Sequence, residues 1–285
     1  MSIDRRTLLG ISAAGLAGVA LTDALARAAE AIGKNKPSLE DAQRQGVQAH
    51  EALMAVPGMQ MHGSEQVALL LYPGFTALDL IGPHFFLASM MGATVHLVAA
   101  QREPVLSDVG VAMLPTARFD EVPEKLDVLL VPGGAEGTVA AARDTATLAF
   151  VKSRGANARY VASVCTGAVI LGAAGLLAGR RATTHWGVRE ALADFGAKPV
   201  DQRVVLDGRL VTGAGVSAGL DLGLALIGLL RGKPFAEAVQ LMAEYAPVPP
   251  YHAGTPGGAP RAIEQSVRGM FAPLLVETRA LAAGS

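Results

Sequence analysis

The chain has 285 residues, with 24 Lys and Arg against 25 Asp and Glu, so its formal net charge is −1. This balance argues against a nucleic-acid-binding protein, because such binding depends on many Lys and Arg side chains that neutralise phosphates. The 51% apolar and 17% charged residues exclude a disordered chain and supply a large core, and the single cysteine cannot form an internal disulfide.

Residues 1–28 have the layout of a signal peptide. Arg5-Arg6 precedes an uncharged run from Leu8 to Leu21, and small residues at the end of the segment provide a cleavage site after Ala28. The apolar run is shorter than the ~20 residues that span a bilayer, so we expect no permanent membrane insertion. The paired arginines resemble a twin-arginine signal, and an ordinary secretory signal is the alternative. Either signal predicts an exported, periplasmic protein.

Residues 29–66 form a polar segment that we interpret as a linker containing one helix. Ser38 and Asp41 have the spacing of a capping box, and apolar residues recur at roughly helical spacing until Pro57-Gly58. No residue in this segment indicates chemistry.

Residues 67–285 alternate short apolar runs with helical patterns, which predicts one α/β domain. Strands are expected at 67–71, 94–99, 126–131 and 160–164, with hairpins at 105–114 and 203–211. Helices are expected at 77–90, 138–154, 166–174, 217–230 and 235–245. Because the strands are apolar throughout, they predict a mostly parallel sheet with both faces covered. Ligands of such folds bind at the carboxyl ends of the strands.

Cys165 follows a predicted strand and directly precedes a predicted helix. The free N–H groups and positive dipole of a helix N-terminus would stabilise a thiolate there, so we interpret Cys165 as a nucleophile. The alternative is a small packed residue, because free cysteines are often buried. Gly167 resembles half of a nucleophile elbow, although Ser163 stands where the other glycine would be.

Two further strand ends carry candidate site residues. Gly133 and Gly134 follow the strand before Cys165, and bare glycine amides there could receive developing negative charge, or simply form a tight turn. Asp79 begins the first helix between two leucines, where burial would raise its pKa and suit it to proton exchange. The alternative for Asp79 is an interaction with the helix dipole.

The remaining polar candidates are less specific. Thr166 is either a second polar group beside the sulfur or a helix-start residue, and His185 lies near another strand end, where it could activate the thiol or simply be hydrogen-bonded in a loop. The six histidines and one cysteine show no metal-ligand spacing, so no metal is expected. Gly213-Ala214-Gly215 lacks the lysine of a phosphate loop, so no nucleotide is expected either.

Five motifs in order resemble the ThiJ/PfpI superfamily, and within it the branch whose members hydrate isonitriles. The resemblance runs from about Val67 to Ala283. The motifs are Leu71-Tyr72-Pro73-Gly74-Phe75 with Leu78-Asp79-Leu80-Ile81-Gly82-Pro83, Val131-Pro132-Gly133-Gly134, Ser163-Val164-Cys165-Thr166-Gly167, Gly179-Arg180-Arg181-Ala182-Thr183-Thr184-His185-Trp186, and Glu244-Tyr245-Ala246-Pro247 with Pro249-Pro250.

The resemblance implies a flavodoxin-like sandwich of the class I glutamine amidotransferase type, a homodimer without a cofactor, and a small-molecule substrate. It assigns Cys165 as the nucleophile, Asp79 as the acid that handles protons, and Thr166 as the adjacent hydroxyl. Gly133 and Gly134 match the glycine turn that faces the reacting group. Many members have histidine in place of Thr166, so this threonine favours the hydratase-like branch over the protease-like one.

The expected activity is therefore a cysteine-dependent hydration of isonitriles, or of a similar small electrophile, to N-substituted formamides. The alternative from another functional class is a thiol-based redox sensor or ligand-binding protein in which Cys165 performs no turnover. A protease or deglycase needs an activating base that the sequence does not place.

Overall fold

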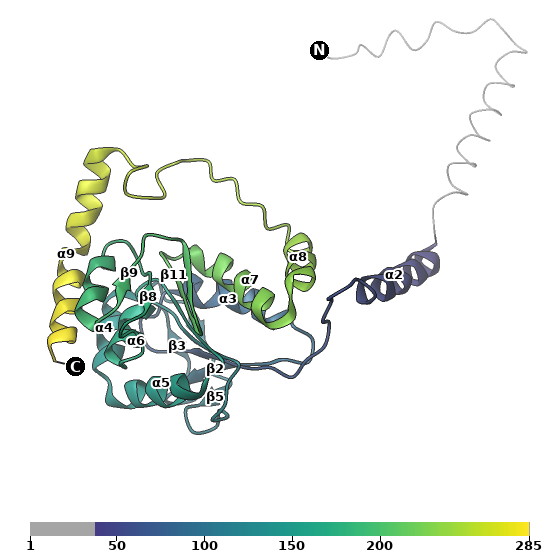
Figure 1. Ribbon diagram of the computed structural model, residues 1–285, viewed down its shortest axis with the longest axis horizontal. Helices are drawn as coiled ribbons and strands as arrows, with labels where there is room; N and C mark the ends of the chain where they lie inside the picture. Colours follow the sequence, from purple (N-terminus) through teal and green to yellow (C-terminus); the bar gives the residue numbers. More distant parts are fainter. Residues whose placement is uncertain (1–37, 285) are drawn as a thin grey trace, which may run out of the picture. The chain divides into compact units, whose positions relative to one another are not determined.

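A computed structural model of the chain describes residues 38–284 (Figure 1). The predicted signal peptide and the first part of the predicted linker therefore lie outside the described residues. The described residues fall into two units, one ending at Ala55 and the other beginning at Val56. The folded body thus starts before the predicted boundary at residue 67.

Helix α2 (Leu39–Met54) is the structured part of the first unit, and it confirms the helix predicted in this segment. Its capping box is present: the Ser38 hydroxyl accepts the Asp41 N–H at 3.0 Å, and the Asp41 carboxylate accepts the Ser38 N–H at 3.2 Å. No residue of α2 is buried.

A seven-stranded sheet forms the centre of the second unit. Its order is β10 (Val204–Asp207), β11 (Leu210–Gly213), β7 (Tyr160–Val164), β6 (Val128–Val131), β1 (Gln66–Leu70), β2 (Thr94–Ala99) and β5 (Ala117–Arg118). All neighbours are parallel except β10 and β11, which confirms the predicted mostly parallel sheet. The order β2-β1-β6-β7-β11 is the 2-1-3-4-5 order of flavodoxin-like folds.

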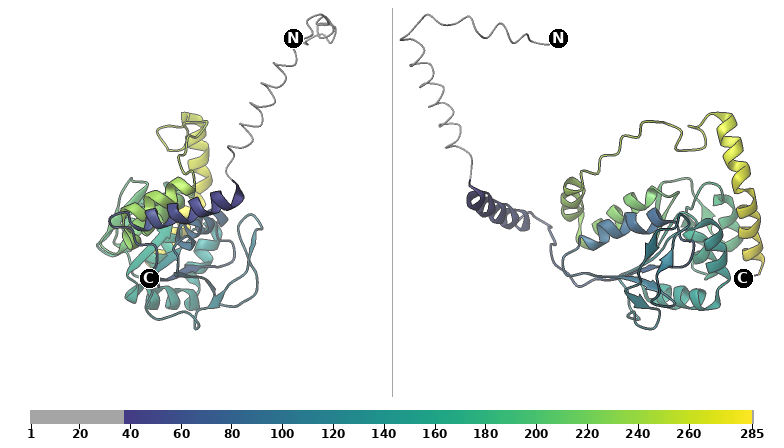
Figure 2. Two further views of the ribbon diagram at one scale, coloured as in Figure 1. Left: turned by 90° about the vertical axis from the view of Figure 1, so that its right-hand side faces the viewer. Right: turned by 180° about the vertical axis from the view of Figure 1, so that it is seen from behind.

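Helices cover both faces of this sheet, which explains why its central strands are apolar throughout (Figures 1 and 2). One layer contains α3 (Ala77–Ala88), α7 (Ala218–Arg231) and α8 (Lys233–Met242). The other contains α4 (Ala135–Arg143), α5 (Thr145–Asn157) and α6 (Gly167–Ala173). Helix α9 (Arg261–Ala283) lies outside this second layer against α4, α6 and the 3₁₀ helix η1 (Arg189–Phe195).

Several elements differ from the sequence prediction, and β5 and η1 are among those that were not predicted. The helix expected at 138–154 is two helices, because Asp144 ends α4 and caps α5 by accepting the Thr147 N–H at 2.8 Å. Helix α9 and the short pair β8 (Arg181–Ala182) with β9 (Lys198–Pro199) were not predicted. The hairpin of β3 (Val105–Leu106) and β4 (Ala112–Met113) was predicted.

Across residues 38–284, no helix combines the length and the apolar character needed to cross a membrane.

Candidate active site

Three loops meet at the carboxyl edge of the sheet, and each carries or lies next to a residue singled out from the sequence. The loops follow β1, β6 and β7, which are neighbours in the sheet order, and they lead into α3, α4 and α6. Asp79 lies in the first turn of α3, just beyond the loop after β1, and Gly133 and Cys165 lie in the loops after β6 and β7. The position is next to the point between β1 and β6 where the strand order reverses, which is where such sheets bind ligands.

Cys165 occupies a strained turn between β7 and α6. Its φ is 54°, a left-handed conformation that is uncommon outside glycine. The Cys165 N–H donates to the Ala214 carbonyl at 2.8 Å, and its carbonyl accepts the Thr184 hydroxyl at 2.5 Å. A Cβ on Gly167 would lie 2.1 Å from the Val131 carbonyl oxygen, so only glycine permits this turn. These contacts hold the backbone of Cys165 in place, and the residue is 6% exposed.

Asp79 is fully buried at the start of α3. Its Oδ2 accepts the Gly133 N–H at 2.9 Å, while Oδ1 accepts no hydrogen bond of good geometry within residues 38–284. Burial raises the pKa of Asp79 to about 7, against the lowering effect of hydrogen bonds from Gly133 and the Cys165 thiol. The carboxyl can therefore take up and release a proton near neutral pH, as expected from its apolar neighbours.

The ionisation of Cys165 differs from the sequence prediction. Burial raises the pKa of the Cys165 thiol well above its ordinary value, and the charge of Asp79 raises it further. The backbone N–H groups of Thr166 and Val216 lower it, but they do not outweigh the burial. The Thr166 amide at the helix N-terminus therefore acts in the predicted direction, but burial and the charge of Asp79 outweigh it, so the pKa of the thiol is raised rather than lowered.

The glycine amides also have a different role from the one predicted. Gly133 N–H is bonded to Asp79, and Gly134 N–H donates to the Thr166 hydroxyl at 3.0 Å. Neither amide is free to receive charge on a reacting group. They fix the two polar side chains instead. A Cβ on Gly133 would lie 2.6 Å from Thr166 N and 2.7 Å from Asp79 Oδ2, which explains the glycine at this position.

A chain of hydroxyl groups extends from Thr166 into the protein. The Oγ1 atoms of Thr166 and Thr138 are 2.7 Å apart, and Thr138 Oγ1 is 3.3 Å from the Tyr72 hydroxyl, which donates to the Pro132 carbonyl at 2.7 Å. Thr138, Thr166 and Tyr72 are all buried.

Sequence reasoning missed three contributors to this site, Thr138, Tyr72 and the Val216 amide. Tyr72 stands in the first recognised motif, and Val216 directly follows the glycine pair that was considered as a phosphate loop. Thr138 offers no such signal, since it lies inside the segment expected to be an ordinary helix.

His185 does not pair with the cysteine. Its Nδ1 accepts the Gly187 N–H at 3.1 Å, and its ring packs against Phe271 of α9 with a centroid distance of 4.3 Å. Burial lowers the pKa of His185 to about 4, so the imidazole is neutral. Of the two alternatives for His185, the structure therefore shows the histidine hydrogen-bonded in a loop, and the preceding Thr184 makes the contact to Cys165. The same residues contain no group of three or more His, Cys, Asp or Glu arranged to hold a metal ion.

Several known proteins are similar to this chain. A model of the DJ-1/PfpI family matches residues 65–229, which include all three loops of the site. Isonitrile hydratase from Pseudomonas putida is 49% identical over 210 residues, covering 74% of this chain and 91% of that protein. A deglycase from Thermococcus kodakarensis is 32% identical over 148 residues, covering 52% of this chain and 88% of that protein.

A similar structure has also been solved. The crystal structure of a ThiJ/PfpI family protein from Pseudomonas syringae superposes with a TM-score of 0.78 at 49% identity. The match covers 80% of this chain and 94% of that one.

Proposed function

This chain belongs to the DJ-1/PfpI family, and from that premise we propose that it is a cysteine-dependent hydratase that converts isonitriles to N-substituted formamides. The observation that carries the proposal is the pairing of a buried thiol with a buried carboxyl whose pKa is about 7. The similarity to a relative named isonitrile hydratase gives the substrate class. The narrow terminal carbon of R–N≡C also suits a cysteine that is only 6% exposed.

The first step uses the thiol and the carboxylate together. Asp79 takes the proton from Cys165 as Sγ forms a bond to the terminal carbon, and Asp79 then delivers that proton to the same carbon. The product is a thioimidate, R–N=CH–S–Cys165. Because the proton has only to move between neighbouring groups, the thiol need not be ionised in the resting enzyme.

Water completes the reaction in two steps. Its oxygen adds to the thioimidate carbon, while Asp79 accepts a proton from the water and passes it to the nitrogen. The resulting R–NH–CH(OH)–S–Cys165 loses its hydroxyl proton through Asp79 to sulfur as the C–S bond breaks. The balance is R–NC plus H₂O giving R–NH–CHO, and the thiol and carboxylate are regenerated.

The test is turnover of cyclohexyl isocyanide by the purified protein, with N-cyclohexylformamide measured by mass spectrometry. We expect product with the native chain and none with Cys165→Ala. Glu190→Gln, which changes an exposed carboxylate of η1, serves as the control and should retain full activity. Equal product from Cys165→Ala, or none from the native chain, would remove the hydratase proposal.

A redox sensor is the competing function for the same cysteine. Peroxide reacts with the thiolate form, and a buried thiol with a raised pKa holds little thiolate at neutral pH. A raised thiol pKa would slow nucleophilic attack as well, so the argument for turnover rests on the pairing of Cys165 with Asp79, which takes the thiol proton as the new bond forms. Stoichiometric oxidation of Cys165 by mild peroxide, without any isonitrile turnover, would favour the sensor instead.

A further inference from the structure

A cavity of about 600 Å³ lies beside the carboxyl ends of β1 and β2. We call it the β2 crevice. It opens between α4 and the loop of residues 100–104, and buried apolar residues line its floor: Leu71, Ala99, Val105 and Ala141. Its lining includes neither Cys165 nor Asp79. The β2 crevice is therefore distinct from the proposed active site.

Tyr72 lies between the β2 crevice and the proposed active site. It lines the β2 crevice, while its hydroxyl donates to Pro132 and contacts Thr138 on the side of the reacting residues. Because it is buried and held by these contacts, Tyr72 is a fixed part of the fold. The half-buried ring of Phe119 adds a second aromatic surface to the lining.

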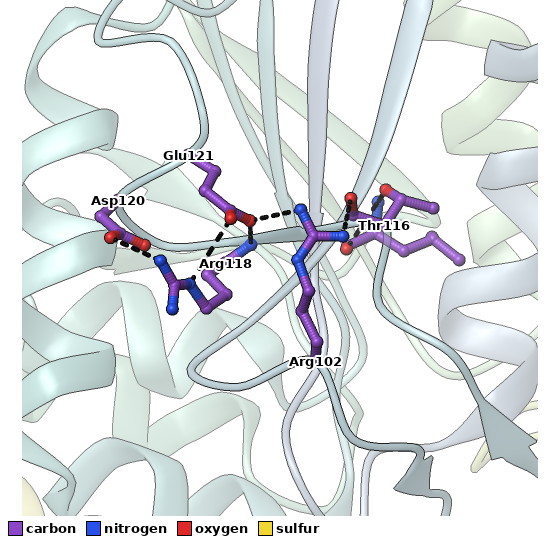
Figure 3. A network of polar contacts seen from close by, with 6 residues as sticks. Arg102, Thr116, Arg118, Asp120 and Glu121 are labelled. Atoms are coloured by element: carbon purple, nitrogen blue, oxygen red, sulfur yellow. Dashed lines mark hydrogen bonds and ion pairs between the residues drawn. The ribbon is translucent and has the colours of Figure 1, made fainter.

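The charged residues that line the β2 crevice are all acidic. Among its lining residues, Glu103 and Asp144 carry charge, and both are exposed at the rim. The basic residue next to Glu103, Arg102, is bound to Glu121 at 2.7 Å, and Arg118 also lies within the network around Glu121 (Figure 3). The basic residue next to Asp144, Arg143, is bound to Glu277. No ion pair to Glu103 or Asp144 occurs within residues 38–284.

From this geometry we propose that the β2 crevice is a binding site for a small hydrophobic amine. Its volume lies within the range of about 300–1,000 Å³ typical of small-molecule sites. A flat apolar body suits the apolar floor and the aromatic side chains of Tyr72 and Phe119 in the lining. An ammonium group at the mouth would meet the exposed carboxylates of Glu103 and Asp144, although Asp144 Oδ2 also accepts the Thr147 N–H. This assignment is independent of the hydratase proposal.

The experiment compares three ligands that share an indole ring, using calorimetric titration of the whole protein at low ionic strength. Tryptamine carries an ammonium, 3-ethylindole is neutral, and indole-3-propionate carries a carboxylate. We expect saturable 1:1 binding of tryptamine, weaker binding of 3-ethylindole and the weakest binding of the propionate. Absence of saturable tryptamine binding, or equal affinity for the propionate, would overturn the proposal.

Variants then locate the site. The double change Glu103→Gln with Asp144→Asn removes both charges, and asparagine retains the helix-capping ability of Asp144. It should weaken tryptamine binding by about fivefold, as expected for two exposed ion pairs, and leave 3-ethylindole unchanged. Ala100→Phe, at an exposed lining position, should fill the β2 crevice and block both ligands.

Two further variants test whether tryptamine binds in the β2 crevice or elsewhere on the protein. Glu190→Gln removes an exposed charge from η1 and should leave tryptamine affinity unchanged. Cys165→Ala should also bind tryptamine normally, because Cys165 does not line the β2 crevice. If Ala100→Phe left binding intact, or if Cys165→Ala removed it, the ligand would occupy another place and the assignment would be wrong.

Discussion

Asp79→Asn separates the chemical role of the carboxyl from its effect on stability. Asparagine has nearly the same volume and can still accept the Gly133 N–H that now bonds to Oδ2. It cannot transfer a proton, so we expect kcat to fall by about 10²-fold or more, the ordinary contribution of a general acid and base. The same change should make the protein more stable at alkaline pH, since a buried negative charge is removed.

The magnitude follows from the pKa of Asp79, which burial raises from 3.8 to about 7. The folded state favours the protonated carboxyl of Asp79. The contribution of this group to the free energy of unfolding is therefore fully present below pH ~4 and is lost as the pH rises through ~7. A difference of about three pKa units corresponds to about 4 kcal/mol, of which about 2.5 kcal/mol is lost between pH 5 and pH 8. Asp79→Asn does not titrate and avoids this loss.

The assay is urea unfolding of the native and Asp79→Asn proteins at pH 5 and pH 8. The stability of the variant relative to the native protein should increase with pH by about 2.5 kcal/mol. Glu190→Gln is the matched control, because it makes the same replacement of a carboxylate by an amide at an exposed position. A pH-independent difference for Asp79→Asn, or one of opposite sign, would refute the raised pKa. Activity within tenfold of the native protein would show that Asp79 is structural only.

Three other changes test the site and the export signal. In Gly133→Ala the added Cβ would lie 2.6 Å from Thr166 N, so the site residues must move apart. A displacement of about 1 Å should lower kcat roughly 10²-fold. Formamide production measures this change, and a circular dichroism spectrum checks that the variant is folded. Thr138→Val removes the hydroxyl that orients Thr166 and should lower kcat more than it changes KM, with Thr138→Ser restoring the rate; equal kinetics for both variants would exclude this orienting role. Replacing the arginines at positions 5 and 6 by lysine should retain the protein in the cytoplasm, which cell fractionation measures, and continued export would favour an ordinary secretory signal.

Much of the proposed site could be located from local pattern alone. Each of Asp79, Gly133 and Cys165 follows an apolar strand, and in a parallel sheet the carboxyl ends of neighbouring strands share one edge. The helix split at Asp144 was missed because the flanking residues continue a helical pattern, and only the cap to Thr147 reveals the break. Helix α9 was missed because it packs on the outside of the domain, and just one of its residues, Thr278, is buried.

The sequence by itself determined the fold class and the strand ends that carry the candidate site residues, since periodicity and turn residues are local properties of the chain. The tertiary structure decided how those groups behave. The Gly133 amide bonds to a carboxylate 54 positions away, and Thr166 bonds to a threonine 28 positions away. Burial, rather than the helix N-terminus, sets the pKa of Cys165. Desolvation and long-range hydrogen bonds depend on what the whole fold packs around a group, and no local stretch of sequence contains that information.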